Sequence, residues 1–282
     1  MTQIITSIDT LRDTLSQHRE RGQTIGFVPT MGSLHAGHMD LVRACKDACD
    51  ITVASIFVNP MQFGPNEDFD AYPRTLEADN DKLTAEGADY LFAPTVREMY
   101  PHGVNTQIDV PSLANILCGA SRPGHFAGVA TVVSKLFNIV QPHQAFFGRK
   151  DFQQLAVIRQ MARDLLMPLS IVGVPTGRAD DGLALSSRNA YLTDTERAQA
   201  PLLYQSLQSA RQRILDGETD FAAIQRDATI ALNAAGFRVD YFEVRCAHAL
   251  SSAGLADTKL VILVAAYLGK ARLIDNVELQ KP

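Results

Sequence analysis

The sequence has no tryptophan, few cysteines and no long hydrophobic run. Its 282 residues include four cysteines, too few for a disulfide framework, so we expect reduced thiols in a reducing compartment. The longest apolar run, 260–268, is about half the length of a membrane span. Asp9, Arg12 and Asp13 lie where a signal peptide would need an apolar core. We therefore predict a cytoplasmic protein with no membrane partner.

Positive charge is not in excess either. The 26 Lys and Arg residues are outnumbered by 31 Asp and Glu residues, which gives a net charge of -5. This balance argues against a nucleic-acid partner bound over the whole surface, because such binding depends on many phosphate contacts. A local basic pocket is still compatible with it.

Three common site signatures are absent or disfavoured. Neither Gly-x-Gly-x-x-Gly nor Gly-Lys-Ser/Thr occurs, which weakens dehydrogenase and kinase hypotheses. His35, His38, Cys45 and Cys49 resemble a zinc set, but the segment 39–49 is predicted to be helical. At about 1.5 Å rise per residue, His38 and Cys45 would lie roughly 10 Å apart along the axis, whereas zinc ligands converge within about 2.3 Å of one point. Buried thiols are the better interpretation.

The hydrophobic pattern predicts an α/β fold with two domains. Short β-rich runs alternate with helical patterns, which is typical of a parallel sheet with helices on both faces. The predicted strands are 24–28, 51–58, 90–93, 145–147 and 169–174, and the predicted helices are 41–48, 75–86, 129–140 and 152–166. Residues 1–176 are predicted to form this domain, and residues 177–282 a smaller C-terminal α+β domain. Its predicted helices are 194–215 and 221–235, and its predicted strands are 241–245, 260–266 and 271–274.

The most informative segment is Pro29-Thr30-Met31-Gly32-Ser33-Leu34-His35-Ala36-Gly37-His38. It follows the first predicted strand, and a helix is predicted to begin near His35. The N–H groups and positive end of a helix N-terminus favour an anion, and phosphate is the usual occupant after such a strand. His35 and His38 lie three apart and can reach the same phosphates. A lone histidine here would more often be a capping or solvated group.

Polar groups also follow other predicted strands. Asn59 and Gln62 end the second strand, where a small polar substrate is expected in an open α/β sheet. The segments 122–126 and 148–154 place cationic and amide groups near helix starts. The segment Leu185-Ser186-Ser187-Arg188-Asn189 offers hydroxyls and a guanidinium that suit a triphosphate. An ordinary turn is the alternative for each of these segments taken singly.

The whole set resembles the pantothenate synthetase family, and His-Ala-Gly-His also resembles the His-x-Gly-His signature of nucleotidyltransferases. The segments that carry the resemblance are 29–38, 55–63, 72–76, 122–126, 150–154 and 185–189. It implies a Rossmann-like first domain, a smaller domain that acts as a lid, and a homodimer. It also implies a ligase that joins pantoate to β-alanine through a pantoyl adenylate, with ATP as co-substrate and Mg²⁺ required.

The resemblance further implies roles for individual residues. His38 is the expected proton donor, and His35, Lys150 and Arg188 are the other expected catalytic groups. The implied nucleotide contacts are Met31, Gly32, Ser33, Leu34, His35, Ala36, Gly37, His38, Gly148, Arg149, Lys150, Asp151, Gly177, Leu185, Ser186, Ser187 and Arg188. The implied substrate contacts are Gln62, Gln154, Asn59, Met31, Arg122, His125 and Tyr72.

Some positions depart from the family pattern or leave a role open. Arg149 stands where an acidic or polar residue is usual, and Ala127 stands where arginine is common. Neither is a presumed catalytic position. Asp79 is a possible Mg²⁺ ligand, but Ala78 and Lys82 leave no convincing carboxylate cluster around it, and the protein ligands of the metal stay unassigned.

The chemistry agrees with these residues. Attack of a carboxylate on the α-phosphorus needs in-line positioning and cations that absorb charge on the departing pyrophosphate. An adenylyltransferase that leaves AMP on its product, or a non-catalytic nucleotide-binding protein, would share the first domain. A tRNA ligase is disfavoured, because no basic anticodon-binding domain is visible in the remaining hundred or so residues.

Overall fold

The computed structural model describes residues 1–64, 67 and 69–281. The chain divides into two compact units. The first consists of Met1–Arg149 and Gln153–Pro175, and the second of Lys150–Phe152 and Thr176–Pro282. Among the described residues, no helix has both the length and the apolar character needed to cross a membrane.

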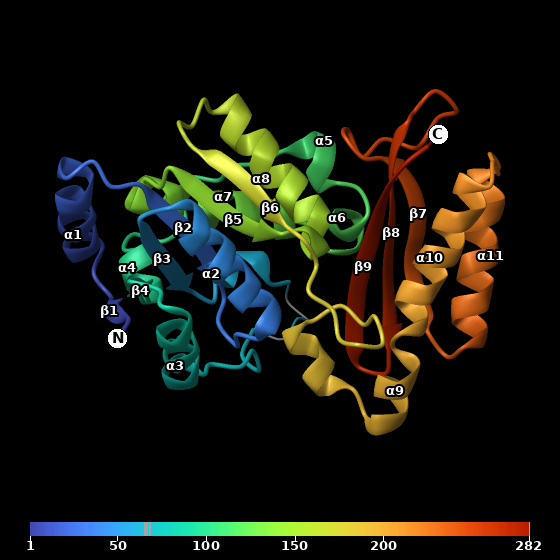
Figure 1. The fold of residues 1–282 in the computed structure, drawn as a ribbon, viewed down its shortest axis with the longest axis horizontal. Helices are drawn as coiled ribbons and strands as arrows, with labels where there is room; N and C mark the ends of the chain where they lie inside the picture. The colour runs from blue at the N-terminus through green and yellow to red at the C-terminus, as the bar shows by residue number, and fades with distance from the viewer. Residues whose placement is uncertain (65–66, 68, 282) are drawn as a thin grey trace. The chain divides into compact units, whose positions relative to one another are not determined.

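The first unit is built on a six-stranded sheet in the order β1-β4-β3-β2-β5-β6 (Figure 1). Every neighbouring pair of strands is parallel. The strands are β1 (Gln3–Ile5), β2 (Ile25–Thr30), β3 (Ile51–Ile56), β4 (Tyr90–Phe92), β5 (Gln144–Gly148) and β6 (Ser170–Val174). The predicted parallel α/β sheet is therefore confirmed.

The connections of this sheet create a switch point between β2 and β5. From β2 the chain runs to β3 and β4 on one side, and then crosses back to β5 and β6 on the other side of β2. Because parallel crossovers are right-handed, the helices of the two halves lie on opposite faces of the sheet. Ligands of such sheets bind where the strand order reverses, at the carboxyl ends of the strands.

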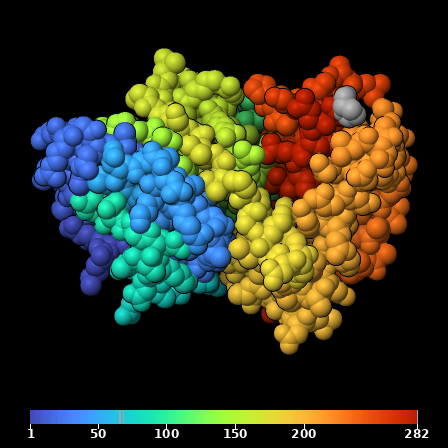
Figure 2. All heavy atoms as spheres, viewed as in Figure 1, coloured from blue at the N-terminus to red at the C-terminus, as the bar shows by residue number. Residues whose placement is uncertain are grey.

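The helices of the first unit cover this sheet. They are α1 (Ile8–Glu20), α2 (Ala36–Ala48), α3 (Leu76–Glu86), α4 (Val96–Met99), α5 (Pro111–Ala114), α6 (Cys118–Ser121), α7 (His125–Val140) and α8 (Phe152–Asp164), with short 3-10 turns η1 (Pro60–Gln62) and η2 (Arg149–Asp151). Helix α2 packs on β2, β3 and β5, whereas α7 packs on β2 and on α1. Segments of α2 and α3, blue and blue-green, form part of the visible surface in Figure 2.

Apolar spacing explains how α2 joins the core. Met39, Val42 and Cys45 lie at three-residue intervals, so they share one helical face. All three are buried in a cluster that also contains Val28 of β2 and Phe146 of β5. The two cysteines of the disfavoured zinc set, Cys45 and Cys49, both belong to this cluster.

The second unit is a three-stranded antiparallel sheet with helices against it. Its strands are β7 (Arg238–Cys246), β8 (Lys259–Leu268) and β9 (Ala271–Gln280), in that order. Its helices are α9 (Asp194–Gln199), α10 (Leu202–Leu215) and α11 (Phe221–Ala234), with the 3-10 turn η3 (Ser187–Tyr191). Helices α10 and α11 lie side by side against the strands (Figure 1). The predicted smaller α+β fold is confirmed.

Several details differ from the expectations. The pattern does not predict β1, α1 or the short helices α4, α5 and α6, and β9 continues to Gln280, beyond the predicted 271–274. The pattern also predicts one helix over 194–215. The chain instead ends α9 at Gln199 and begins α10 at Leu202, with Pro201 as the residue before the second helix. Proline lacks the N–H that a helix interior needs, and so it separates the two helices.

Candidate active site

The loop after β2 has a backbone that needs glycine. Gly32 has φ +87°, and Ser33 follows with φ +52°. A Cβ atom at Gly32 would lie 3.0 Å from Ile56 Cγ2 and 3.3 Å from Asp79 Oδ2. Both the left-handed conformation and the close approach therefore favour glycine here, and the chain can turn sharply from β2 into α2.

Helix α3 holds this loop through two side chains. The Asp79 carboxylate is fully buried, and it accepts hydrogen bonds from Ser33 N–H and Leu34 N–H, each at 2.8 Å. The Lys82 Nζ donates to the Leu34 carbonyl at 2.7 Å. One side chain of α3 thus binds the N–H groups of the loop, while another, three residues on, binds a carbonyl.

This arrangement changes the expected role of the loop amides. Successive N–H groups in left-handed or turn conformations form a cradle for an anion, and the sequence predicts a phosphate there. At Ser33 and Leu34 the anion is the protein's own Asp79. These two N–H groups therefore hold the loop to α3.

The same contacts bear on Mg²⁺. Both Asp79 oxygens already accept backbone hydrogen bonds. Within residues 1–64, 67 and 69–281, no group of three or more His, Cys, Asp or Glu side chains is arranged to hold a metal ion. The described side chains therefore do not fit a dedicated protein site for Mg²⁺.

The two histidines of His-Ala-Gly-His cap helix α2. His35 is the N-cap residue, and its Nδ1 accepts from Gly37 N–H at 3.2 Å. His38 reaches back, and its Nδ1 accepts from His35 N–H at 3.3 Å. This is a capping box built from two imidazoles, whose ring centroids are 4.1 Å apart. The same two histidines that are predicted to bind phosphate therefore also cap the helix.

The capping bonds determine which ring nitrogen carries the proton. A backbone N–H can only donate, so Nδ1 of each ring must be the unprotonated acceptor. The neutral form of each ring then carries its hydrogen on Nε2. The capping bonds therefore involve Nδ1 of each ring and not Nε2.

The turn after β3 adjoins the loop after β2. Gln62 Nε2 lies 2.9 Å from Met31 Sδ. Helix α7 packs closely on this turn, because a Cβ atom at Gly128 would lie 2.4 Å from the Met61 carbonyl oxygen. Asn59 is fully buried and donates to the Gly128 carbonyl at 3.2 Å. Of the predicted substrate contacts, Met31, Asn59 and Gln62 therefore lie together.

Arg122 and His125 also meet this turn. The Arg122 guanidinium pairs with both Glu67 carboxylate oxygens at 2.6 Å, and its Nη1 lies 2.9 Å from His125 Nε2. His125 Nδ1 lies 2.8 Å from the Gln62 carbonyl. Burial raises the pKa of Glu67, but hydrogen bonds and charge from Arg122 outweigh it and lower the pKa overall. Buried Tyr72 packs edge-on against the Phe63 ring.

The segment that begins at the end of β5 contains three more of the predicted contacts, Gly148, Arg149 and Gln154. Gly148 ends β5, and half-buried Gln154 lies in the first turn of α8. The Arg149 Nε donates to the Gly173 carbonyl of β6 at 3.1 Å. Ala127, the other departure from the family pattern, is buried in the first turn of α7. Ala127 is thus part of the packed interior, whereas Arg149 is exposed and bonds to β6.

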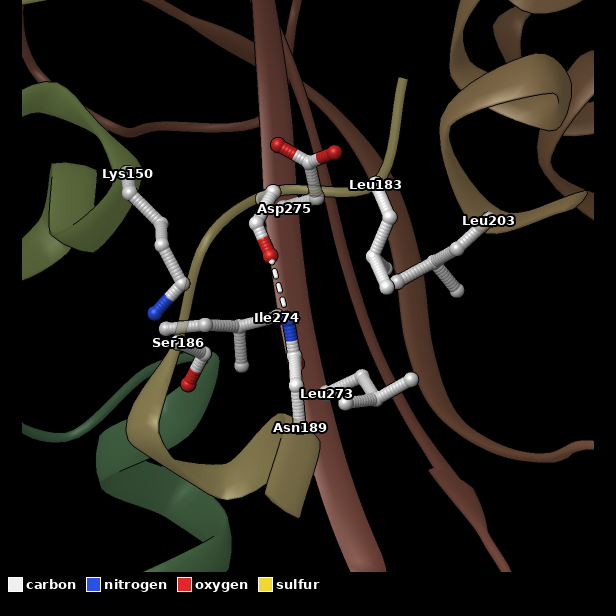
Figure 3. A pocket seen from close by; sticks show the side chains of 9 residues that line it. Lys150, Leu183, Ser186, Asn189, Leu203, Leu273, Ile274 and Asp275 are labelled. Carbon is white, nitrogen blue, oxygen red and sulfur yellow. Dashed lines mark hydrogen bonds between the residues drawn. The ribbon is translucent and has the colours of Figure 1, made fainter. Parts of the chain in front are cut away.

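The remaining predicted contacts belong to the second unit, where two of them, Lys150 and Ser186, line a pocket (Figure 3). The lining residues are Lys150, Leu183, Ala184, Ser186, Asn189, Leu203, Leu273, Ile274 and Asp275. The Lys150 Nζ lies 3.7 Å from Asp151 Oδ2. Ser186 caps η3 by accepting from Arg188 N–H at 3.3 Å. Ser187 and Arg188 are the first residues of that turn.

Two further side chains, those of Asn276 and Arg178, bond to residues that line this pocket. The Asn276 Nδ2 donates to the Lys150 carbonyl at 2.9 Å. Arg178 forms a two-point ion pair with buried Asp275, at 2.6 and 2.9 Å, and it stacks 3.7 Å above the Tyr204 ring. The Gly177 carbonyl accepts from Leu185 N–H at 2.9 Å. The predicted Ser-Ser-Arg segment therefore follows a short hairpin that is tied to β9.

Sequence reasoning missed several residues that build these sites. They are Lys82, Glu67, Gly128, Arg178 and Asn276, and also Asp79 in its loop-holding role. Their contacts join segments far apart in the chain, such as Leu34 with Asp79, 45 residues away. No local pattern could have indicated these contacts.

The sheet order and the capped glycine loop at the switch point define a Rossmann-like nucleotide-binding α/β protein. A family model described as pantoate-beta-alanine ligase matches residues 3–278. A pantothenate synthetase of Pseudomonas putida (strain W619) is 58% identical over 275 residues, which is 97% of this chain and 96% of the relative. The chain therefore belongs to the pantoate-β-alanine ligase family.

Solved structures agree with this membership. The crystal structure of pantothenate synthetase from Thermus thermophilus has a TM-score of 0.93 and 46% identity, and 100% of each chain is covered. A pantoate-beta-alanine ligase from Francisella tularensis has a TM-score of 0.83 and 36% identity, with 98% of this chain and 97% of that chain covered. Its crystals contain that protein complexed with beta-gamma ATP and beta-alanine.

Proposed function

We propose that this chain joins pantoate to β-alanine to form pantothenate, with ATP consumed and AMP and pyrophosphate released. The observation that carries this proposal is the family match over residues 3–278. Met31 and Gln62 support it, because they are in contact at the loop where an α/β sheet of this topology binds nucleotides. The product is a precursor for coenzyme A, as the resemblance implies.

In the first step, a pantoate carboxylate oxygen attacks the α-phosphorus of ATP, and the bond to the pyrophosphate oxygen breaks. His35 and His38 are proposed to donate Nε2–H hydrogen bonds to the phosphate oxygens, where negative charge grows. Lys150, Ser186, Ser187 and Arg188 are proposed as further phosphate contacts. Lysine offers a compact charge, and arginine offers a planar fork that matches phosphate oxygens.

Pantoate is proposed to bind at Gln62 and Gln154. Gln62 already lies against Met31 at the turn after β3, so a substrate there would adjoin the nucleotide loop. Asn59 is fully buried, so it is proposed to hold this turn in place behind the substrate. Tyr72, Arg122 and His125 are proposed for the substrate end of the site.

In the second step, the β-alanine amine attacks the acyl carbon of pantoyl adenylate, and AMP leaves. Positioning and exclusion of water are the main requirements, because water would hydrolyse the adenylate. No covalent enzyme intermediate is needed on this route. The predicted C-terminal domain, residues 177–282, is proposed to act as the lid.

Mg²⁺, a homodimer and a cytoplasmic location complete the proposal. The described carboxylates offer no cluster for a metal, so we expect Mg²⁺ to enter with the ATP phosphates rather than to occupy a resident site. The homodimer is implied by the resemblance, and the location by the sparse cysteines. Analytical ultracentrifugation of the purified protein tests the dimer.

Product analysis tests the function directly. The purified protein is incubated with ATP, Mg²⁺, pantoate and β-alanine, and the products are separated by chromatography and mass spectrometry. We expect pantothenate and free AMP in equal amounts. AMP that stays attached to the acyl group in the presence of β-alanine would instead support the adenylyltransferase alternative.

A further inference from the structure

A chain of three buried side chains supports the turn after β3. The Tyr100 hydroxyl lies 2.9 Å from Asn59 Oδ1, and Asn59 Nδ2 lies 3.2 Å from Gln62 Oε1. The exposed fractions are 8% for Tyr100, 0% for Asn59 and 7% for Gln62. Tyr100 follows α4, far along the chain from η1, and no sequence motif indicates it.

Backbone groups fix the orientation of the Asn59 amide. The Met61 N–H donates to Oδ1 at 3.3 Å, and the Gly128 carbonyl accepts from Nδ2 at 3.2 Å. A backbone N–H can only donate and a carbonyl can only accept, so a flipped amide would lose both bonds. The Asn59 NH₂ group must therefore face Gln62, and it meets the carbonyl oxygen of that side chain.

This order fixes Gln62 in turn. Its Oε1 is used by Asn59, so its other end, Nε2, is the end that faces Met31. Gln62 consequently presents a hydrogen-bond donor beside the nucleotide loop. A ligand at this point must offer an acceptor, such as a carboxylate or hydroxyl oxygen.

Tyr100 completes the chain at its far end. The second lone pair of Asn59 Oδ1 accepts from the Tyr100 hydroxyl, because Met61 N–H occupies the first. Burial raises the pKa of Tyr100 to about 12, so the phenol keeps its proton under ordinary assay conditions. Lys135 Nζ lies 4.9 Å from the centre of the Tyr100 ring, and this contact helps to hold the ring in place.

We propose that Tyr100 is a positioning residue of the ligase reaction, which acts through Asn59 to hold the Gln62 NH₂ group toward an acceptor oxygen of pantoate. The proposal rests on the proposed function, because that function places pantoate at Gln62. Tyr100 does not touch the substrate. Its removal should weaken pantoate binding and leave ATP binding nearly unchanged.

The test compares two variants that each lose one phenol oxygen. Tyr100→Phe removes the hydroxyl at the end of the chain. Tyr90→Phe is the matched control, because its hydroxyl contacts His18 at 2.7 Å instead. Initial rates give the KM for pantoate and for ATP, and thermal melting checks that each variant is folded.

We expect Tyr100→Phe to raise the KM for pantoate about 5- to 50-fold, since the buried Asn59 Oδ1 loses one of its two donors, while the KM for ATP changes less than about twofold. Tyr90→Phe should change neither constant. An unchanged pantoate KM in a folded Tyr100→Phe protein overturns the proposal, and so does an equal rise in both constants.

A second variant keeps the test decisive if Tyr100→Phe folds poorly. Asn59→Asp retains the acceptor for Tyr100 but cannot donate to Gln62, so it too should raise the pantoate KM selectively. A wild-type pantoate KM in this variant overturns the proposal. Failure of the proposed function is separate, because the wild-type protein would then form no pantothenate in the same assay.

Discussion

His35 and His38 combine structure and chemistry in the same side chains. Each Nδ1 caps helix α2, and the neutral form of each ring carries its hydrogen on Nε2. A proton or hydrogen bond donated by His38 would come from Nε2, while Nδ1 keeps the cap.

Substitution of His38 separates the two roles. We expect His38→Ala to lower kcat at least about tenfold, because a donor to the developing phosphate charge is lost. His38→Gln should retain more activity, since its terminal NH₂ group can also donate. Steady-state rates at saturating substrates measure the effect.

The control for the lost cap is Asp220→Ala at the start of α11. Asp220 caps that helix by accepting from Ala223 N–H at 2.9 Å. This variant should lower the melting temperature, as cap removal costs about 1 kcal/mol, but leave kcat unchanged. If His38→Ala lowered only the melting temperature, the role of His38 on the phosphates would be wrong.

Cys45 gives a prediction about thiol chemistry. Burial raises its pKa to about 12, so the native thiol stays neutral, whereas an unfolded thiol ionises above about pH 8.5. The native state should therefore lose stability as pH rises from about 8.5 toward 12. Alkylation of the native protein at pH 8 should modify half-buried Cys246 before Cys45. Mass spectrometry of the labelled peptides would show equal rates if this account fails.

Among the elements, α3 has the least expected role. Its sequence predicts only an ordinary crossover helix, yet Asp79 and Lys82 hold both the N–H groups and a carbonyl of the loop after β2. The loop needs this support because Gly32 and Ser33 both have positive φ, a conformation that is costly for serine.

Asp79→Asn tests the support from α3. An asparagine offers one acceptor oxygen in place of two and turns an NH₂ group toward a loop N–H. Loss of a charged hydrogen bond in a buried place costs about 1.5 to 3 kcal/mol, so we expect kcat/KM for ATP to fall about tenfold or more.

Asp81→Asn is the matched control, because Asp81 is exposed on the same helix. It should leave kcat/KM for ATP near the wild-type value. Equal effects of the two variants, or a wild-type value for Asp79→Asn, would contradict the role of Asp79 as the loop anchor.

For the whole molecule, the features that could be predicted from the sequence are those that depend on local pattern. Parallel strands, the loop of His35 and His38, and the polar groups at Asn59 and Gln62 all follow from short segments. Contacts between distant segments, such as Lys82 with Leu34 or Gly128 with Met61, could not be predicted, because they depend on how the elements pack. Pro201, which separates α9 from α10, is a local signal of a helix break. The helical pattern over 194–215 nevertheless predicts a single helix.

The adenylate route is the central claim for the whole molecule, and one measurement tests it most directly. The protein is incubated with ATP, Mg²⁺, pantoate and labelled pyrophosphate, without β-alanine, and the label in ATP is measured. Reversible formation of pantoyl adenylate predicts label in ATP that depends on pantoate. Absence of exchange in a preparation that makes pantothenate when β-alanine is added would contradict the route.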